Sequence, residues 1–212
     1  MYRGERFNGY THLAGAVLAL AGASVLVTMA AMKADAMRIV SFSIYGATLI
    51  LLYLISTLYH STRGRAKDVL RKLDHCSIYL LIAGTYTPIG LIIMSRAWAI
   101  PVLSVVYAGA AAAILLKLFW VQAPKVLSAI LGLALGWVGV VAYSQIGKIG
   151  VAGIALILIG GLFYTVGAVV YARRRPDPLP AVLGYHELFH ICTIAAAACH
   201  WAAIAFFVLP RA

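Results

Sequence analysis

Long apolar runs, each free of Asp, Glu, Lys and Arg, alternate with short polar segments along almost the whole chain. Each run approaches the ~20 residues that an α-helix needs to cross the hydrocarbon core of a bilayer. The pattern therefore predicts an all-α membrane protein, a seven-transmembrane helix bundle that forms a single domain over residues 1–212. Its expected spans are 12–32, 39–60, 75–95, 97–116, 126–147, 149–172 and 188–210.

The composition agrees with this class. Of the 212 residues, 64% are hydrophobic and only 11% are charged, whereas charged residues make up about 25% of a soluble domain. The longest charged segment, residues 61–73, is expected to form a short surface helix that leads into the third span. Residues 173–180 contain three prolines and are expected to form an extended turn.

The distribution of basic residues predicts the orientation in the membrane. If the N-terminus is cytoplasmic, 12 of the 17 Lys and Arg residues lie in cytoplasmic segments, as the positive-inside rule requires. The C-terminus is then outside, and the protein is a multi-pass protein of the cell membrane. The net charge of +11 is explained by this asymmetry and by contact with anionic headgroups. Because no nucleic-acid-binding motif or aromatic-interleaved basic groove is present, we expect no nucleic-acid partner.

Five polar side chains are predicted to meet at the cytoplasmic end of the bundle. His60 ends the second span, and Ser56 lies one turn before it on the same face. Asp74 begins the third span, while His186 and His190 begin the seventh and share a face at i,i+4 spacing. Ionisable side chains within a membrane are costly, so their convergence indicates a functional site.

Three imidazoles with a carboxylate beside them indicate a zinc site. Neutral His60, His186 and His190 suit a catalytic Zn²⁺ that keeps its fourth position open. Asp74 would occupy that position directly or hold a water there. The alternative is that these polar residues only join helices at the headgroup level, where histidine is easily accommodated.

The remaining histidines and the cysteines are weaker candidates. His12 lies at the cytoplasmic start of the first span and either reaches the site from outside the ligand set or contacts headgroups. His75 points about 100° away from Asp74, and His200 is expected to make a buried polar contact far from the site. Cysteines 76, 192 and 199 form no CxxC pair and predict no disulfide framework.

One short motif offers a different assignment. Residues 186–190 read HExxH, the pattern in which the glutamate, here Glu187, is the general base of a zinc metalloprotease. Zincins usually draw a third ligand from downstream of the motif. This chain has no Asp or Glu after His190, and His200 lies on the wrong face, so a third ligand must come from earlier in the chain.

Several segments together resemble the bacterial hemolysin III proteins, which belong with the seven-helix progestin-and-adiponectin-receptor family. The resemblance covers essentially the whole chain and rests on motifs in the expected order: Glu5-x-x-Asn8-x-x-x-His12, Ser56-Thr-Leu-Tyr-His60-Ser61, Leu73-Asp74-His75, Ala83-Gly-Thr-Tyr-Thr-Pro88 and His186-x-x-x-His190. It implies that His60, His186 and His190 hold zinc and that Asp74 contacts a zinc-bound water, with Ser56 nearby. It gives Glu187 no role.

The resemblance also suggests a reaction, because the superfamily includes alkaline ceramidases. The first expectation is therefore a zinc-dependent hydrolase of a lipid amide or ester in the cytoplasmic leaflet, with Asp74 and Ser56 as catalytic residues and a ceramide-like or other acyl lipid as substrate. The second is a non-catalytic, zinc-stabilised sensor or regulator of membrane lipid state. The third, suggested by the family name, is a lytic or channel protein. The sequence leaves open whether the chain forms homo-oligomers.

Overall fold

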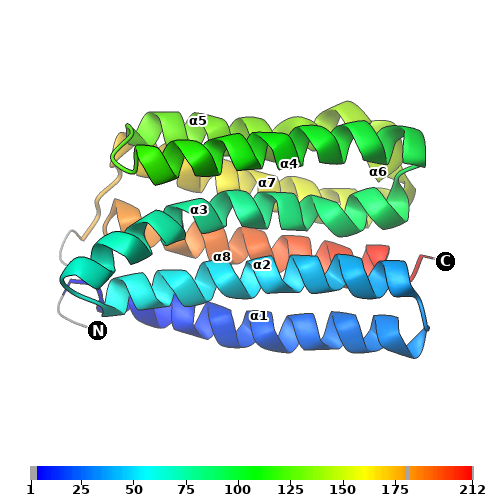
Figure 1. Ribbon diagram of the computed structural model, residues 1–212, viewed down its shortest axis with the longest axis horizontal. Coiled ribbons are helices and arrows are strands. Elements are labelled where there is room, and N and C mark those ends of the chain that lie inside the picture. The colour runs from blue at the N-terminus through cyan, green and yellow to red at the C-terminus, as the bar shows by residue number, and fades with distance from the viewer. Residues whose placement is uncertain (1–3, 180–181, 212) are drawn as a thin grey trace.

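Helices make up nearly all of the chain that the computed structural model describes, residues 4–179 and 182–211. They lie side by side in one bundle, and the two chain termini lie at its opposite ends (Figure 1). No strand occurs in these described residues; Leu179 and Leu183 form only an isolated bridge. The all-helical class predicted from the apolar runs is confirmed.

The first half of the bundle consists of α1 (Arg6–Met32), α2 (Ala36–Ser61), α3 (Arg65–Pro88) and α4 (Arg96–Phe119). The charged segment 61–73 does not form a separate surface helix, since from Arg65 onward it is the beginning of α3. Gly64 has a φ of +68°, which places the turn before α3 at a backbone conformation that glycine adopts readily. Pro88 ends the regular helix, and a π-helical turn, η1 (Ile89–Ile93), follows.

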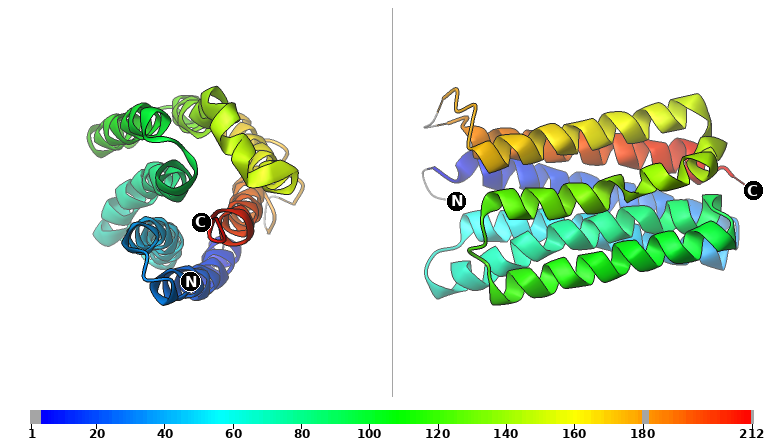
Figure 2. Two further views of the ribbon diagram at one scale, coloured as in Figure 1. Left: turned by 90° about the vertical axis from the view of Figure 1, so that its right-hand side faces the viewer. Right: turned by 90° about the horizontal axis from the view of Figure 1, so that it is seen from above.

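The second half begins with α5 (Lys125–Gly136) and passes through η2 (Trp137–Ala142), α6 (Tyr143–Ile146) and η3 (Gly147–Ile149) into α7 (Gly150–Arg173). The chain reverses direction at η3 and returns along the bundle as α7 (Figure 2). It ends with α8 (Tyr185–Ala203) and the π-helical turn η4 (Ile204–Val208).

Six helical segments of the described chain are long and apolar enough to span a membrane, rather than the seven predicted. The spans expected at 126–147 and 149–172 form one helical stretch of 49 residues, Lys125–Arg173. No extended linker separates them, because short 3-10 turns make the reversal. The Tyr86 hydroxyl bridges the break after α5, where it donates to the Gly136 carbonyl and accepts from the Gly139 N–H, each at 2.7 Å.

Small residues allow α8 to lie closely against its neighbour α7. A Cβ atom on Gly160 would approach the His200 ring to 2.4 Å, and one on Gly167 would approach the Cys192 Cβ to 2.9 Å. Such contacts between glycine and the facing helix let helix backbones approach closely within a membrane. In the end-on view α8 lies between α7 and α1, so its first turn faces the beginning of α1 (Figure 2).

Candidate metal centre

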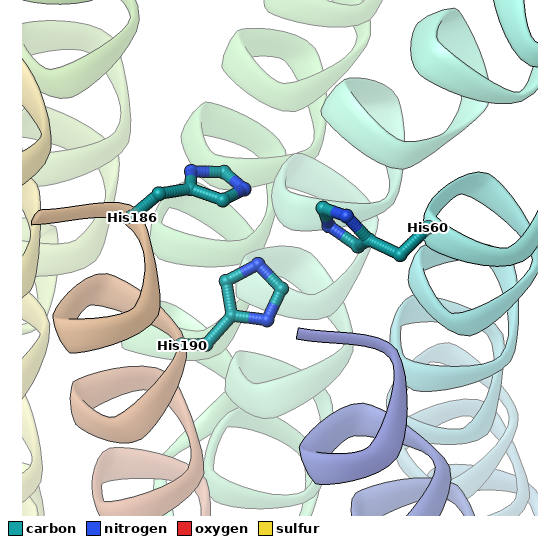
Figure 3. A group of neighbouring side chains, drawn as sticks. All are labelled: His60, His186 and His190. Carbon is teal, nitrogen blue, oxygen red and sulfur yellow. The ribbon is translucent and has the colours of Figure 1, made fainter. Parts of the chain in front are cut away.

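Three histidines from two helices gather at the end of the bundle where α8 begins. His60 lies in the last turn of α2, and His186 and His190 lie one turn apart in α8. One nitrogen from each ring falls within a group whose members are all within 4.8 Å of one another. All three rings point toward a common centre (Figure 3). The α-helical i,i+4 spacing places two of the rings on one face, and the end of α2 supplies the third.

The unpartnered atoms of this group fit a metal ion. The Nε2 atom of His60 and the Nδ1 atom of His190 are buried and have no hydrogen-bond partner among the described residues. A buried polar nitrogen without a partner costs on the order of 1–3 kcal/mol. An ion bound by these nitrogens would remove that penalty, and three imidazoles with an open fourth position form a donor set typical of zinc.

The other nitrogen of His60 is held by a carboxylate from the start of the chain, Glu5. His60 Nδ1 pairs with the Glu5 carboxylate, whose second oxygen accepts a 2.9 Å hydrogen bond from the Lys67 ammonium. Metal-binding histidines generally donate their second N–H to such a partner, which fixes the tautomer and the ring orientation. The pairing therefore assigns His60 Nε2 as the atom available to a metal.

Glu5 itself keeps its charge at any ordinary pH. Partial burial raises the pKa of its carboxyl group, but the hydrogen bonds and the charges of His60 and Lys67 outweigh burial and lower the pKa from 4.5 to about 2. The only signal in the sequence was the position of Glu5 at the head of the motif that continues with Asn8 and His12. A polar segment without periodicity gives no other indication of its role.

His12 lies beside the ligand set and is not at the surface. Its ring stacks on that of His190 with centroids 3.7 Å apart, and it meets Tyr53 edge-on at 5.1 Å. The side chain is buried, and neither ring nitrogen has a hydrogen-bond partner in the part of the chain that the structure describes. Of the two roles that the sequence left open, the structure favours the one close to the site, where His12 supports the His190 ring.

Glu187 uses both of its carboxylate oxygens to fix the beginning of α8. One accepts a 2.7 Å hydrogen bond from the Asn8 side-chain amide of α1, and the other accepts the Gly184 N–H at 2.9 Å. The second bond is half of a capping box, which satisfies an otherwise free N–H at a helix start. Glu187 therefore positions α8 against α1, and its oxygens are not available in the way a metalloprotease base requires.

Ser56 and Asp74 lie together on facing helices next to His60. The Ser56 hydroxyl reaches the Asp74 carboxylate, whose Oδ2 atom is 3.7 Å from His75 Nδ1. Asp74 lies near His60, although it does not belong to the group of atoms within 4.8 Å of one another. This placement fits a carboxylate that acts on a water beside the histidines rather than a fourth direct ligand. His75 bonds the Arg71 carbonyl at 2.7 Å.

The remaining candidates lie away from the cluster. His200 Nε2 bonds the Ile157 carbonyl at 3.2 Å, which is the polar contact that the sequence predicted, made by a half-buried side chain. Cys76 points toward the Ile114 carbonyl of α4, and Cys192 packs against Gly167 of α7. All three cysteines are free thiols.

A large cavity opens from the histidine cluster into the bundle. Its volume is about 1170 Å³, and its walls include His60, Ser56 and Asp74 at one end and Tyr143 and Gly147 at the other. Pockets for small ligands measure about 300–1,000 Å³, so this one can hold a long molecule. Most of the residues between the two ends are apolar, as an acyl chain would require.

Comparisons with known proteins give a consistent assignment. The family described as Haemolysin-III related matches residues 1–201. The chain is 33% identical to the hemolysin-3 homolog of Bacillus subtilis (strain 168), over 96% of this chain and 93% of that protein. It is also 33% identical to hemolysin-3 of Bacillus cereus, over 98% of this chain and 93% of the relative. It is 26% identical to an adiponectin receptor protein of Drosophila melanogaster, over 98% of this chain and 51% of the receptor. No solved structure matches the chain significantly.

Proposed function

The chain belongs to the haemolysin-III-related family of multi-pass integral membrane proteins, and on that premise we propose that it is a zinc-dependent hydrolase of a lipid amide or ester. One observation supports the proposal above the others. Three imidazole nitrogens within 4.8 Å of one another, two of them from buried side chains, lie beside a serine and an aspartate at the head of a 1170 Å³ cavity.

The proposal includes seven membrane crossings with the N-terminus in the cytoplasm. The stretch Lys125–Arg173 folds back on itself at η3, and α7 returns along the bundle, so it has the course of two crossings (Figure 2). The excess of basic residues on the side of the histidine cluster supports its cytoplasmic placement. The site would then lie in the cytoplasmic leaflet, at the depth where the headgroup linkage of a lipid lies.

His60, His186 and His190 would hold the zinc ion. Zinc bound to three imidazoles supplies Lewis-acid activation of a water molecule and of the substrate carbonyl. Glu5 holds the His60 ring in place through Nδ1, and His12 packs on the His190 ring. These contacts fix the ligand rings before the metal binds, which lowers the entropy that binding costs.

Asp74 would transfer protons, and Ser56 would stabilise the negative charge that develops in the reaction. The Asp74 carboxylate, beside His60, accepts the proton of the attacking water and passes it to the leaving amine or alcohol, as a general base and then a general acid. The Ser56 hydroxyl donates a hydrogen bond to the negative charge that develops on the carbonyl oxygen. The apolar walls of the cavity hold the acyl chain and exclude water from the reaction.

Zinc content and lipid hydrolysis test the proposal together. Purified protein should contain about one zinc per chain and should release fatty acid from short-chain or long-chain ceramides, or from ester lipids, in nanodiscs. His60→Ala should lose both properties. His200→Ala, which also removes a histidine but one away from the cluster, should retain both. No release above a chelated control across amide and ester lipids would refute the hydrolase.

The same measurements identify the other functions that the family allows. Full zinc occupancy and zinc-dependent stability without any hydrolysis would support a sensor, which the many contacts of Glu5, Asn8 and Glu187 around the ligands also suit. Two Bacillus relatives bear the name hemolysin-3 or its homolog. Lysis of cells by the purified protein, without lipid hydrolysis, would support the activity in that name.

A further inference from the structure

A lysine without a counter-charge lies buried in the cavity wall near the metal centre. Lys117, in the last turn of α4, is only 2% exposed. Within the described residues it has no hydrogen bond and no ion pair with any carboxylate. Its side chain lines the cavity.

A second lysine faces the same cavity from the beginning of α5. The Lys125 ammonium donates a 3.0 Å hydrogen bond to the Tyr185 hydroxyl and lies over the rings of Tyr171 and Tyr185, 4.2 and 4.6 Å from their centroids. These partners orient the ammonium without neutralising it. Lys117 and Lys125 thus flank the turn between α4 and α5, and that turn also lines the cavity.

Among the described residues, no carboxylate lies within ion-pair distance of Lys117 or Lys125. Glu5 is bound by His60 and Lys67, and Glu187 by Asn8 and the Gly184 N–H. Asp74 lies with Ser56 and His75. Lys117 is almost fully removed from water and has no counter-ion, which is costly. With Lys125 on the same cavity, it indicates that an anionic group completes this part of the cavity.

The two lysines lie next to the metal centre rather than at the far end of the cavity. The charge of Lys125 acts on His186, and that of Lys117 acts on His75, the neighbour of Asp74. A molecule that reaches from the lysines to Asp74 would therefore place its charged group beside the reacting centre and its acyl chain along the apolar walls. Two ammonium groups match the two negative charges of a phosphate monoester better than the single charge of a carboxylate.

From this arrangement we propose that the cavity takes a lipid with a phosphate in its headgroup, and that Lys117 and Lys125 bind that phosphate. The inference rests on the proposed function for the position of the lipid, and it specifies the class of lipid. Neither lysine is a catalytic residue, because each one touches the headgroup and not the bond to be cleaved.

Ceramide 1-phosphate and ceramide form a matched pair of ligands, since they differ only in the phosphate. Binding is measured by thermal stabilisation and by titration in a non-ionic detergent, with a chelator present so that no hydrolysis occurs. Wild-type protein should bind ceramide 1-phosphate at least about tenfold more tightly than ceramide, the effect of one or two charge-assisted hydrogen bonds. Equal binding of the two lipids would overturn the proposal.

Substitutions test whether Lys117 and Lys125 cause the preference for the phosphate. Lys117→Met and Lys125→Met should each lose most of the preference for the phosphate and keep the affinity for ceramide. Lys72→Met is the control, because Lys72 is an exposed residue at the same end of the bundle and does not line the cavity. Lipid-free Lys117→Met should unfold at the same temperature as wild type or higher, since it removes an unpaired buried charge. A preference kept in both cavity variants, or lost in Lys72→Met, would refute the site.

Two further ligands distinguish a site for a lipid phosphate from a site for a soluble ion or a carboxylate. Stabilisation of wild type by inorganic phosphate alone, as strong as that by the lipid, would show a site for a soluble ion and overturn the lipid part of the proposal. Equal stabilisation by a free fatty acid would show a carboxylate site. A preference for the phosphate in a protein that hydrolyses nothing would refute only the hydrolase, whereas hydrolysis with no preference would refute only the phosphate site.

Discussion

The carboxylate that holds His60 should determine how tightly the protein binds zinc. Glu5 is fully ionised at neutral pH, because its pKa is about 2, so Glu5→Gln removes a whole negative charge from His60 Nδ1. The amide oxygen of Gln can still accept the ring N–H. Glu5→Ala removes both the charge and the acceptor.

The two substitutions should weaken zinc binding by different amounts. Loss of a carboxylate behind a metal-binding histidine typically costs about 10- to 100-fold in metal affinity, or roughly 1.4–2.7 kcal/mol. We expect Glu5→Gln near the tenfold end and Glu5→Ala near the hundredfold end. Neither should abolish binding, since all three ligand nitrogens remain.

Competition with a chromophoric chelator at pH 7 measures the affinity of the purified protein in detergent. Asp68→Asn is the control, because Asp68 is an exposed acid at the same end of the bundle, in the first turn of α3. The unfolding temperatures of the zinc-loaded variants should fall in the same order as their affinities. Wild-type affinity in Glu5→Ala, or an equal loss in Asp68→Asn, would refute the assignment of Glu5 as the support of His60.

Four further results follow from the same structure. A reporter active only outside the cytoplasm, fused to the C-terminus, should be active, and a cytoplasmic reporter there should be silent; the opposite result would exclude an odd number of crossings from a cytoplasmic N-terminus. Asp74→Asn should abolish hydrolysis with zinc retained, whereas Glu187→Gln should reduce it only mildly; the reverse pattern in an activity assay would favour a metalloprotease. Ser56→Ala should lower kcat by roughly 10²-fold if the hydroxyl stabilises the oxyanion, and an unchanged kcat would show that it only packs. Gly160→Leu should lower the unfolding temperature and the zinc content together, because its side chain would displace the facing helix; an unchanged melting curve would contradict the close packing of α7 and α8.

The apolar runs predicted most of the fold because burial in a membrane leaves a simple pattern. Residues free of charge for about 20 positions form helices there, and the observed helices lie where the runs lie. The sequence predicted a boundary at Lys148, and the chain reverses there. Short 3-10 turns make the reversal, so Lys125–Arg173 is one continuous helical stretch rather than two separate helices. The polar segment 61–73 has no apolar run, and nothing in its pattern distinguished a separate surface helix from the first turns of α3.

The site was predictable where regular helix geometry relates residues to one another. The i,i+4 pair of His186 and His190 and the shared depth of His60 sufficed to predict their approach, and the structure brings their nitrogens together. The contacts that support them were not predictable in the same way. Glu5 reaches His60 from a segment without periodicity, and the burial of Lys117 depends on how α4 turns relative to the cavity, which a run of apolar residues does not encode.

The bond between Asn8 and Glu187 joins residues 179 positions apart and has a consequence for biosynthesis. Glu5 and Asn8 leave the ribosome long before His186 and His190. The proposed zinc site therefore cannot form before α8 has been synthesised, and a protein truncated before α8 would have no means of retaining the metal. Zinc cannot assist the insertion of the early helices, but once α8 has entered it can bind only the finished bundle and stabilise it against unfolding. Metal retention would thus distinguish completed molecules from incomplete ones within the same membrane.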